Sequence, residues 1–237
     1  MRLRSAVVVA VAVFTAAPAI AQNNPPAGYT ALFNGKDLNG WRGRQPNYNP
    51  AEEAKLTKEE LADKQAKWNA DRDAHWRVDA EKKEIVSDGQ SPHLATTKDY
   101  GDFEMLVDWL MVSPNGDSGI YLRGIPQVQI WDPSNQRELR NGADKGSGAL
   151  WNNRGDSPAR FPLVKADKPI GEWNRLKIRM IGDKVSVGLN DQLTVDDQVM
   201  HNYFDKAGGP VPARGPIELQ THGSEMRFKN IYIKEIK

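Results

Sequence analysis

Three segments of the chain alternate apolar residues with polar or aromatic residues of the kinds that bind sugars. The members of each group lie two positions apart, so in a strand they would share one face. The groups are Tyr121 and Arg123; Gln127, Gln129 and Trp131; and Glu218, Gln220 and His222. Amides, carboxylates and a guanidinium pair with sugar hydroxyls, and aromatic rings stack on sugar C–H faces. Together these segments predict a carbohydrate-binding surface.

Each of these residues also has a purely structural explanation. The glutamines could form the solvated side of an antiparallel sheet. Arg123 could pair across strands with Glu104 or Asp108, His222 could be a hydrogen-bonded residue at a strand end, and Trp131 could belong to the core. The functional interpretation depends on three separate segments presenting the same kind of face.

Other common kinds of site are excluded by the residues that are absent. The chain has four histidines, at positions 75, 93, 201 and 222, and none is paired at the i, i+4 spacing of zinc sites. There is no cysteine, which argues against disulfides and thiolate metal centres. No cofactor is predicted with certainty. Calcium bound through loop carboxylates is left open, because no spacing amounts to an EF-hand-type signal, so metal ligands are unknown.

The elements that would position these residues are strands. Period-two alternation runs through residues 102–109, 175–180, 184–189 and 217–222, with turn signals between the segments. No helix-sized segment intervenes, and no fixed-period repeat is present. The pattern predicts an all-β fold, an antiparallel sandwich. An Asn-Gly turn after Leu32 and Phe33 predicts a first edge strand within residues 29–41.

Residues 49–74 differ in composition from the rest and predict a helical insertion. Asn49 before Pro50 is a helix start, and Thr57 with Glu60 forms a capping box. The apolar positions are sparse, so the helix must dock through a narrow face that contains Leu61, Gln65 and Trp68. Either this insertion is a solvated decoration or it is a lid over a site.

The N-terminal residues have the pattern of a secretory signal, and the rest of the chain is close to neutral. Arg2 and Arg4 precede an apolar run that ends at small residues, which predicts cleavage after Ala21 and a secreted or periplasmic protein. Cleavage would change 32 basic against 31 acidic residues into 30 against 31. This balance predicts no attraction to nucleic acid, and no membrane span is expected after cleavage. Residues 22–28 would be a linker and residues 29–237 one domain. The oligomeric state is not predicted.

The sequence resembles the 3-keto-disaccharide hydrolase domain family, formerly DUF1080, whose members have a concanavalin A-like jelly-roll fold. The resemblance begins with Leu-Phe-Asn-Gly-Lys-Asp-Leu-Asn-Gly-Trp and ends with Arg-Phe-Lys-Asn-Ile-Tyr-Ile. The matching stretches are residues 32–41, 100–104, 117–124, 127–132, 171–174, 189–190, 215–223 and 227–233. One departure is Pro126 before Gln127, where many members carry Tyr-Glu, and another is Asp191 in place of a glycine.

The resemblance implies a small carbohydrate substrate, a glycoside already oxidised to a ketone at C3 of the sugar. A ketone at C3 acidifies the C2–H bond, so a base could remove that proton and the C1 substituent could leave by elimination, followed by hydration. Such a route needs a base, an acid and donors for the C3 oxygen. The residues assigned are Arg123 for the oxyanion, His222 or Glu218 as the base, Asp117 or Asp132 as the proton donor, and Tyr121, Gln127, Gln129, Trp131, Asn152 and Gln220 for substrate binding.

Two other functions are compatible with this fold. A lectin-like module would bind glycans without cleaving them. A conventional jelly-roll glycoside hydrolase would need two carboxylates about 5–5.5 Å apart for the retaining mechanism. The Glu-x-Asp-x-Glu pattern usual in such glucanases is not found in the sequence.

Overall fold

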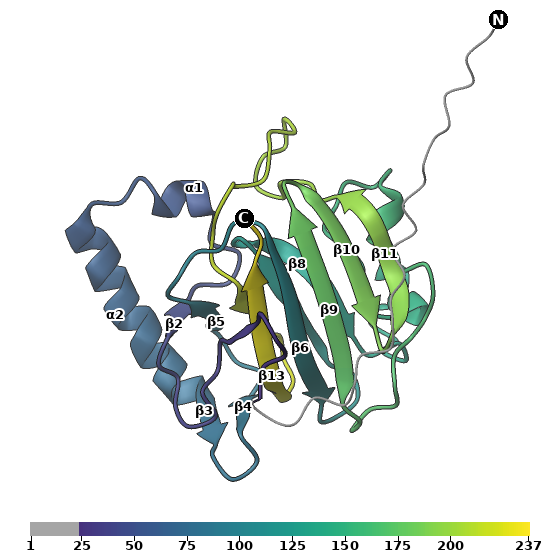
Figure 1. Ribbon diagram of the computed structural model, residues 1–237, viewed down its shortest axis with the longest axis horizontal. Coiled ribbons are helices and arrows are strands. Elements are labelled where there is room, and N and C mark those ends of the chain that lie inside the picture. Colours follow the sequence, from purple (N-terminus) through teal and green to yellow (C-terminus); the bar gives the residue numbers. More distant parts are fainter. Residues whose placement is uncertain (1–23) are drawn as a thin grey trace, which may run out of the picture.

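The computed structural model describes residues 24–237 as a sandwich of two antiparallel sheets (Figure 1). The larger sheet has eight strands, in the order β11-β10-β9-β6-β13-β4-β3, with β1 also paired to β13. Its strands are β1 (Thr30–Ala31), β3 (Trp76–Asp79), β4 (Glu84–Ser87), β6 (Phe103–Met111), β9 (Asn174–Ile181), β10 (Lys184–Leu189), β11 (Gln192–Val199) and β13 (Met226–Glu235).

The smaller sheet has five strands in the order β2-β5-β12-β7-β8. Its strands are β2 (Trp41–Arg44), β5 (His93–Thr96), β7 (Asp117–Leu122), β8 (Ile125–Trp131) and β12 (Glu218–Leu219). The loop from β8 to β9 contains three short 3₁₀ helices, Leu139–Asn141, Ala143–Lys145 and Pro158–Arg160. The predicted antiparallel jelly-roll sandwich is therefore confirmed.

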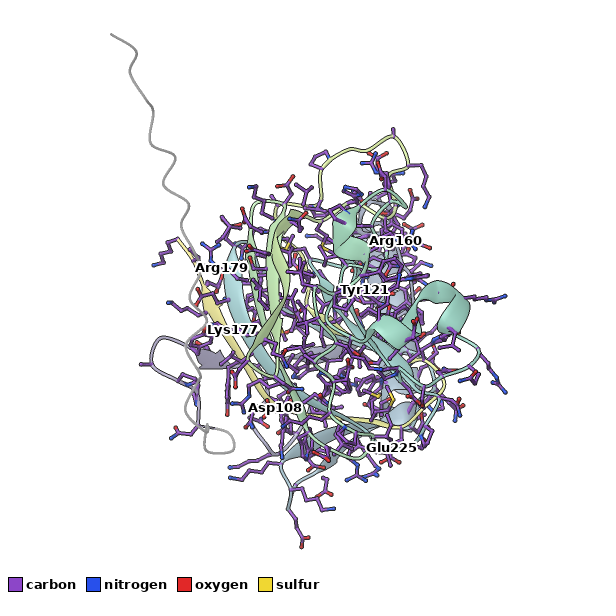
Figure 2. All side chains as sticks on the ribbon, turned by 90° about the vertical axis from the view of Figure 1, so that its right-hand side faces the viewer. Asp108, Tyr121, Arg160, Lys177, Arg179 and Glu225 are labelled. Atoms are coloured by element: carbon purple, nitrogen blue, oxygen red, sulfur yellow. The ribbon has the colours of Figure 1, made fainter. Side chains whose placement is uncertain are left out.

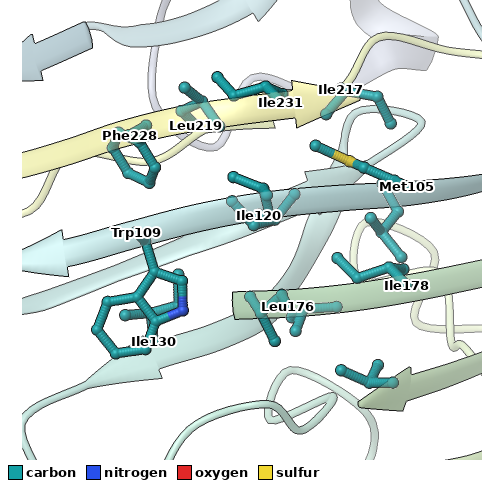
Figure 3. Packing of buried hydrophobic residues seen from close by; sticks show 14 of the residues in the cluster. Met105, Trp109, Ile120, Ile130, Leu176, Ile178, Ile217, Leu219, Phe228 and Ile231 are labelled. Carbon is teal, nitrogen blue, oxygen red and sulfur yellow. The ribbon is translucent and has the colours of Figure 1, made fainter. Parts of the chain in front are cut away.

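The hydrophobic core lies between the two sheets (Figure 3). Alternate side chains along the strands of both sheets point into this core. Met105 and Trp109 on β6 face Ile120 on β7 and Leu219 on β12, and all four are almost completely buried. The outer face of the large sheet is polar, and Lys177 lies there on the side away from Tyr121 (Figure 2). Because the core occupies one face of the small sheet, its other face is available for polar chemistry.

The helical insertion is present where the sequence predicts it. It consists of α1 (Pro50–Glu53) and α2 (Lys58–His75), with Asn49 capping α1 and Thr57 and Glu60 forming the capping box of α2. As expected for a helix with a sparse apolar face, Trp68 is the only residue of α2 that is buried. In Figure 1, α2 lies alongside the edge formed by β2 and β3.

The first predicted strand is shorter than expected. Of residues 29–40, only Thr30 and Ala31 form a strand, and this strand, β1, pairs with β13. The chain then turns around Asn34, whose side-chain oxygen accepts hydrogen bonds from the backbone N–H groups of Lys36 and Asp37. Within residues 24–237, no helix is long and apolar enough to cross a membrane. The predicted signal segment and its cleavage site lie outside the described residues.

Candidate functional site

An open pocket of about 360 Å³ lies on the outer face of the small sheet. Its floor comes from strands of that sheet, and its walls come from the loops before α1 and after β4, β8 and β11. The lining residues are Pro46, Asn47, Gly89, Ser91, His93, Tyr121, Gln127, Trp151, Asn152, Tyr203, Gln220, Thr221, His222 and Gly223. The mixture of amides, imidazoles and aromatic rings is the kind that binds sugars.

A histidine–carboxylate pair stands at the rim of this pocket. His222 follows β12, and its bridge to Asp117 at the start of β7 brings the Nδ1 atom within 2.9 Å of the Asp117 carboxylate. The His222 side chain is 66% exposed, whereas Asp117 is mostly covered. The hydrogen bond to Asp117 raises the pKa of His222, although burial acts in the opposite direction. This pair therefore offers a proton at the mouth of the pocket.

A row of amides continues from Asp117 across β8. Gln129 donates through Nε2 to Asp117 over 2.7 Å, and Gln127 donates through Nε2 to the Oε1 atom of Gln129 over 2.6 Å. An ionised carboxylate only accepts hydrogen bonds, so this order fixes the orientation of both amides. Gly119 makes room for the row, because a Cβ atom there would lie 2.5 Å from the Oε1 atom of Gln127.

Three amide oxygens at the pocket have no hydrogen-bond partner among residues 24–237. They belong to Gln127, Asn152 and Gln220, and all three residues line the pocket. A buried acceptor without a partner costs about 1–3 kcal/mol. A ligand that brings several hydroxyl groups would satisfy these acceptors, so the pocket is suited to a polyol or a sugar.

A second histidine–carboxylate pair lies in the floor. His93 on β5 has its Nδ1 atom 3.3 Å from Glu218 on β12, and neither side chain is more than 1% exposed. Glu218 also accepts a 2.6 Å hydrogen bond from Arg44 on β2. Burial raises the pKa of Glu218, but the positive charge of Arg44 and the contact with His93 outweigh it, so the net shift is downward. Glu218 is thus held as a carboxylate beneath His93.

The two pairs differ in what they can reach. The Glu218 carboxylate is covered by its partners and does not line the pocket, whereas the His93 ring does. Since Nδ1 of His93 is at Glu218, the opposite nitrogen, Nε2, is the one left for a ligand. The His93 ring packs edge-on against Tyr121, with 4.8 Å between ring centroids.

Several residues predicted to form the site meet in this pocket. His222, Tyr121, Gln127, Asn152 and Gln220 line it directly. Asp117, Gln129 and Glu218 stand behind the lining and hold it in place through the hydrogen bonds described above.

Three predicted residues lie elsewhere. Arg123 follows β7 in the left-handed region, at φ 54°, after an irregularity in the pairing with β8, and its side chain turns away from the sheet face that carries Tyr121. It is buried against the backbone carbonyls of Gly101, Gly182 and Pro212. The expectation that Tyr121 and Arg123 share a face is therefore wrong.

Asp132 and Trp131 likewise have local partners. Asp132 accepts hydrogen bonds from the backbone N–H groups of Asn115 and Ser134 and from the hydroxyl of Ser134. Burial raises its pKa, but these bonds outweigh the effect and the pKa is lowered. The Trp131 indole donates to the Gly146 carbonyl and lies outside the pocket.

The pocket residues that the sequence interpretation missed include His93, Asn47, Trp151 and Tyr203. The four-residue strand β5 is too short to show a clear alternation, although its parity places His93 and Ala95 on one face. Asn47 and Tyr203 come from loops, where spacing carries no information about direction. Among residues 24–237, no group of three or more histidine, aspartate or glutamate side chains is arranged to hold a metal ion.

The two packed antiparallel sheets place the chain in the jelly-roll class of folds. Residues 28–234 match the family described as "3-keto-alpha-glucoside-1,2-lyase-like domain". The chain belongs to this family, as the resemblance of its motifs predicts.

Comparisons with individual proteins agree with this assignment. The chain is 25% identical to a protein of Bacteroides thetaiotaomicron named "3-keto-disaccharide hydrolase", over 87% of this chain and 78% of that one. Two crystal structures of putative glycosyl hydrolases from Parabacteroides distasonis have a similar fold. One has a TM-score of 0.61 at 22% identity and covers 92% of this chain and 100% of its own. The other has a TM-score of 0.54 at 20% identity, and the match covers 88% of this chain and 99% of that one.

Proposed function

We propose that this protein cleaves 3-keto-glycosides by elimination followed by hydration. A base removes the C2 proton, the C1–O bond breaks, and an acid protonates the departing oxygen. The product is a sugar with a C1=C2 double bond conjugated to the C3 ketone. Water then adds across this bond, with the hydroxyl group going to C1 and a proton to C2. The observation that carries the proposal is that two histidine–carboxylate pairs meet at one pocket.

His93 is the residue we assign as the base. Its ring lies in the floor, and Glu218 accepts from Nδ1, so that Nε2 is unprotonated and directed to the substrate. The carboxylate beneath the ring stabilises the imidazolium that forms when the C2 proton arrives. Glu218 acts through His93 and does not itself touch the sugar.

His222 is the residue we assign as the acid. Its raised pKa favours the protonated form, and its position at the rim suits a leaving group that extends into solvent. Asp117 supports the positive charge and is held in turn by Gln129. The acid is thus an imidazolium, and Asp117 supports it instead of donating the proton itself.

The amides of the pocket bind the remaining oxygens. Gln220 and Asn152 each carry two N–H donors and an unpartnered oxygen, so they can bind the C3 oxygen, where negative charge develops, and a neighbouring hydroxyl. Trp151 and Tyr203 offer aromatic faces to the sugar ring.

The family description says lyase and the relative's name says hydrolase. Elimination followed by hydration fits both words. The predicted signal segment would deliver this activity outside the cytoplasm.

The test uses matched pairs of glycosides, each in its native form and as the 3-keto derivative, in buffered D₂O with and without EDTA. We expect aglycone release from the keto form alone, with deuterium incorporated at C2 of the product. A loss of release in EDTA that Ca²⁺ restores would assign calcium a role. Release from native glycosides would indicate a conventional glycosidase, and saturable binding without release would indicate a lectin-like module. Either of those results would contradict the proposal.

A further inference from the structure

The outer face of the small sheet carries two pockets that share one strand. Along β12 and its extensions, Pro216 lines a pocket of about 490 Å³, and Gln220 lines the 360 Å³ pocket described above. Glu218 lies between these two residues on the same face of the strand, is fully buried and lines neither pocket. Arg44 and His93 cover the Glu218 carboxylate directly. A further cover lies over Arg44 and separates the two pockets, because Tyr48 and Glu53 both contact the Arg44 guanidinium.

The cover is residues 46–53, which we call the strap. Its first residues, Pro46 and Asn47, line the 360 Å³ pocket, whereas Pro50 and Ala51 line the other one. The strap crosses above Gly124, because a Cβ atom built on Gly124 would lie 2.9 Å from Pro50 and 3.6 Å from the Glu218 carboxylate.

The strap is tied to the sheet at both of its ends. The hydroxyl of Tyr121 donates to the side chain of Asn47 over 2.9 Å. At the other end, Glu53 accepts hydrogen bonds from Arg42 and from the buried Arg44. These ties use charged and polar groups of β2 and β7, so the strap forms a fixed wall.

The helix that follows the strap is also anchored closely. A Cβ atom on Gly43 would lie 1.9 Å from the backbone oxygen of Trp68, so α2 lies directly against β2. Gln65 donates to the carbonyl of Gly43, and Asn69 accepts from the N–H of the same residue. The strap is therefore held between β2, which precedes it, and α2, which follows it and packs against β2.

We propose that the strap ends the substrate groove at Asn47, so that the enzyme processes only the terminal, non-reducing sugar of a glycoside. This inference rests on the proposed function, which places the leaving group on C1 at the open rim with His222. C1 and C4 lie at opposite ends of a pyranose ring. His222 is bonded to Asp117 at the start of β7, whereas Asn47 is bonded to Tyr121, four residues further along the same strand, so the two lie at opposite ends of the pocket. A sugar whose C1 substituent points to the rim at His222 therefore directs C4 toward Asn47, where a chain extended at C4 meets the strap.

The first test compares two 3-keto-trisaccharides, one oxidised on the non-reducing terminal ring and one on the middle ring, both with 1,4 linkages. We expect kcat/KM for the terminal ketone to exceed that for the internal ketone by at least about 100-fold, the size of effect that one steric clash or lost polar contact produces. Equal cleavage of both would overturn the strap proposal and leave the elimination proposal standing. Cleavage of neither would contradict both.

The second test measures binding and does not depend on turnover. Calorimetric titration compares methyl glucoside with its 4-O-methyl derivative, and we expect the derivative to bind at least about 10-fold more weakly. In Asn47→Gly the difference should shrink, and the backbone should tolerate the change because Asn47 has φ 53°. Tyr121→Phe removes the hydroxyl that donates to Asn47, so in this second variant the difference between the two glucosides should shrink as well.

Glu52→Gln is the matched control for these variants. Glu52 lies in the same strap but is exposed, pairs with Lys55, and lines neither pocket. We expect its discrimination between the two methyl glucosides to equal that of the wild type. Equal binding of both glucosides by the wild type would contradict the strap proposal whatever the variants show.

Discussion

Glu218 and Arg44 form a charged pair that is almost completely withdrawn from water, with 2.6 Å between their nearest atoms. A third charge, Glu53 of α1, reaches the same guanidinium. The insertion is thereby connected electrostatically to the floor of the pocket. This connection makes the pair both a stability element and a support for His93.

Arg44→Met should destabilise the protein by about 3–5 kcal/mol, because it leaves the buried carboxylate of Glu218 without its cation. The free energy of unfolding in urea measures this loss. The double variant Arg44→Met with Glu218→Gln should recover part of it, since the uncompensated charge is then absent. If the double variant loses the sum of the two single effects, the pair is not coupled as described.

His222 should titrate above its ordinary pKa of about 6.5, and Asp117→Asn should lower that pKa, since the bond to Asp117 is the main cause of the shift. NMR of the imidazole C–H resonances measures both. Because the acid must carry a proton, kcat should fall as pH rises through this pKa in the wild type, and at a lower pH in Asp117→Asn. Asp88→Asn, which removes the partner of the distant His75, is the control and should leave the titration of His222 unchanged.

The two histidines should be separable by the step that each one serves. His93→Asn should lower the rates of deuterium exchange at C2 and of aglycone release together, each by about 10²–10⁴-fold. His222→Asn should retain C2 exchange, lose release of an alkoxide, and still release a good leaving group such as 4-nitrophenolate. His75→Asn supplies the control, because His75 also pairs with an aspartate but lies outside the pocket. The reverse pattern would exchange the two assignments, and equal loss of every step in both variants would contradict them.

Arg123→Met should lower stability by about 2–4 kcal/mol, because the change leaves the backbone carbonyls of Gly101, Gly182 and Pro212 and the carboxylate of Asp102 without their donor. For the folded fraction of this variant, the plot of kcat/KM against pH should have its inflections at the same pH values as that of the wild type. Thermal unfolding together with that profile checks both statements. A variant of normal stability with a large loss of kcat would return Arg123 to the catalytic role that the sequence interpretation gave it.

Strand periodicity was sufficient to predict the sandwich and its core. The alternation in β6 and β9 extends over eight or nine residues, long enough for one face to be assigned to the core. The helix caps at Asn49 and Thr57 could also be predicted, because capping depends on residues that are close in the sequence. Within the site, Gln127 and Gln129 lie on one face of β8, as parity predicts, and their side chains are hydrogen-bonded to each other.

The errors arise where the strands end. Parity assigned Arg123 to the face of Tyr121, but the chain leaves the extended conformation at Arg123 as it turns into β8. Asp132 lies just beyond the end of β8, where a carboxylate next to free backbone N–H groups is used to hold a turn. His93 was missed because its role depends on Glu218, which is 125 positions away in the sequence.

The position of α2 has a consequence for how these molecules behave toward one another. β2 is one of the two edge strands of the small sheet and β3 is one of the two edge strands of the large sheet. α2 joins them on the same side of the sandwich (Figure 1). Unpaired edge strands are templates on which another chain can add a strand and begin to aggregate. Covering β2 with a helix blocks one of these edges at its backbone. The insertion therefore also protects the protein from edge-to-edge self-association at high concentration.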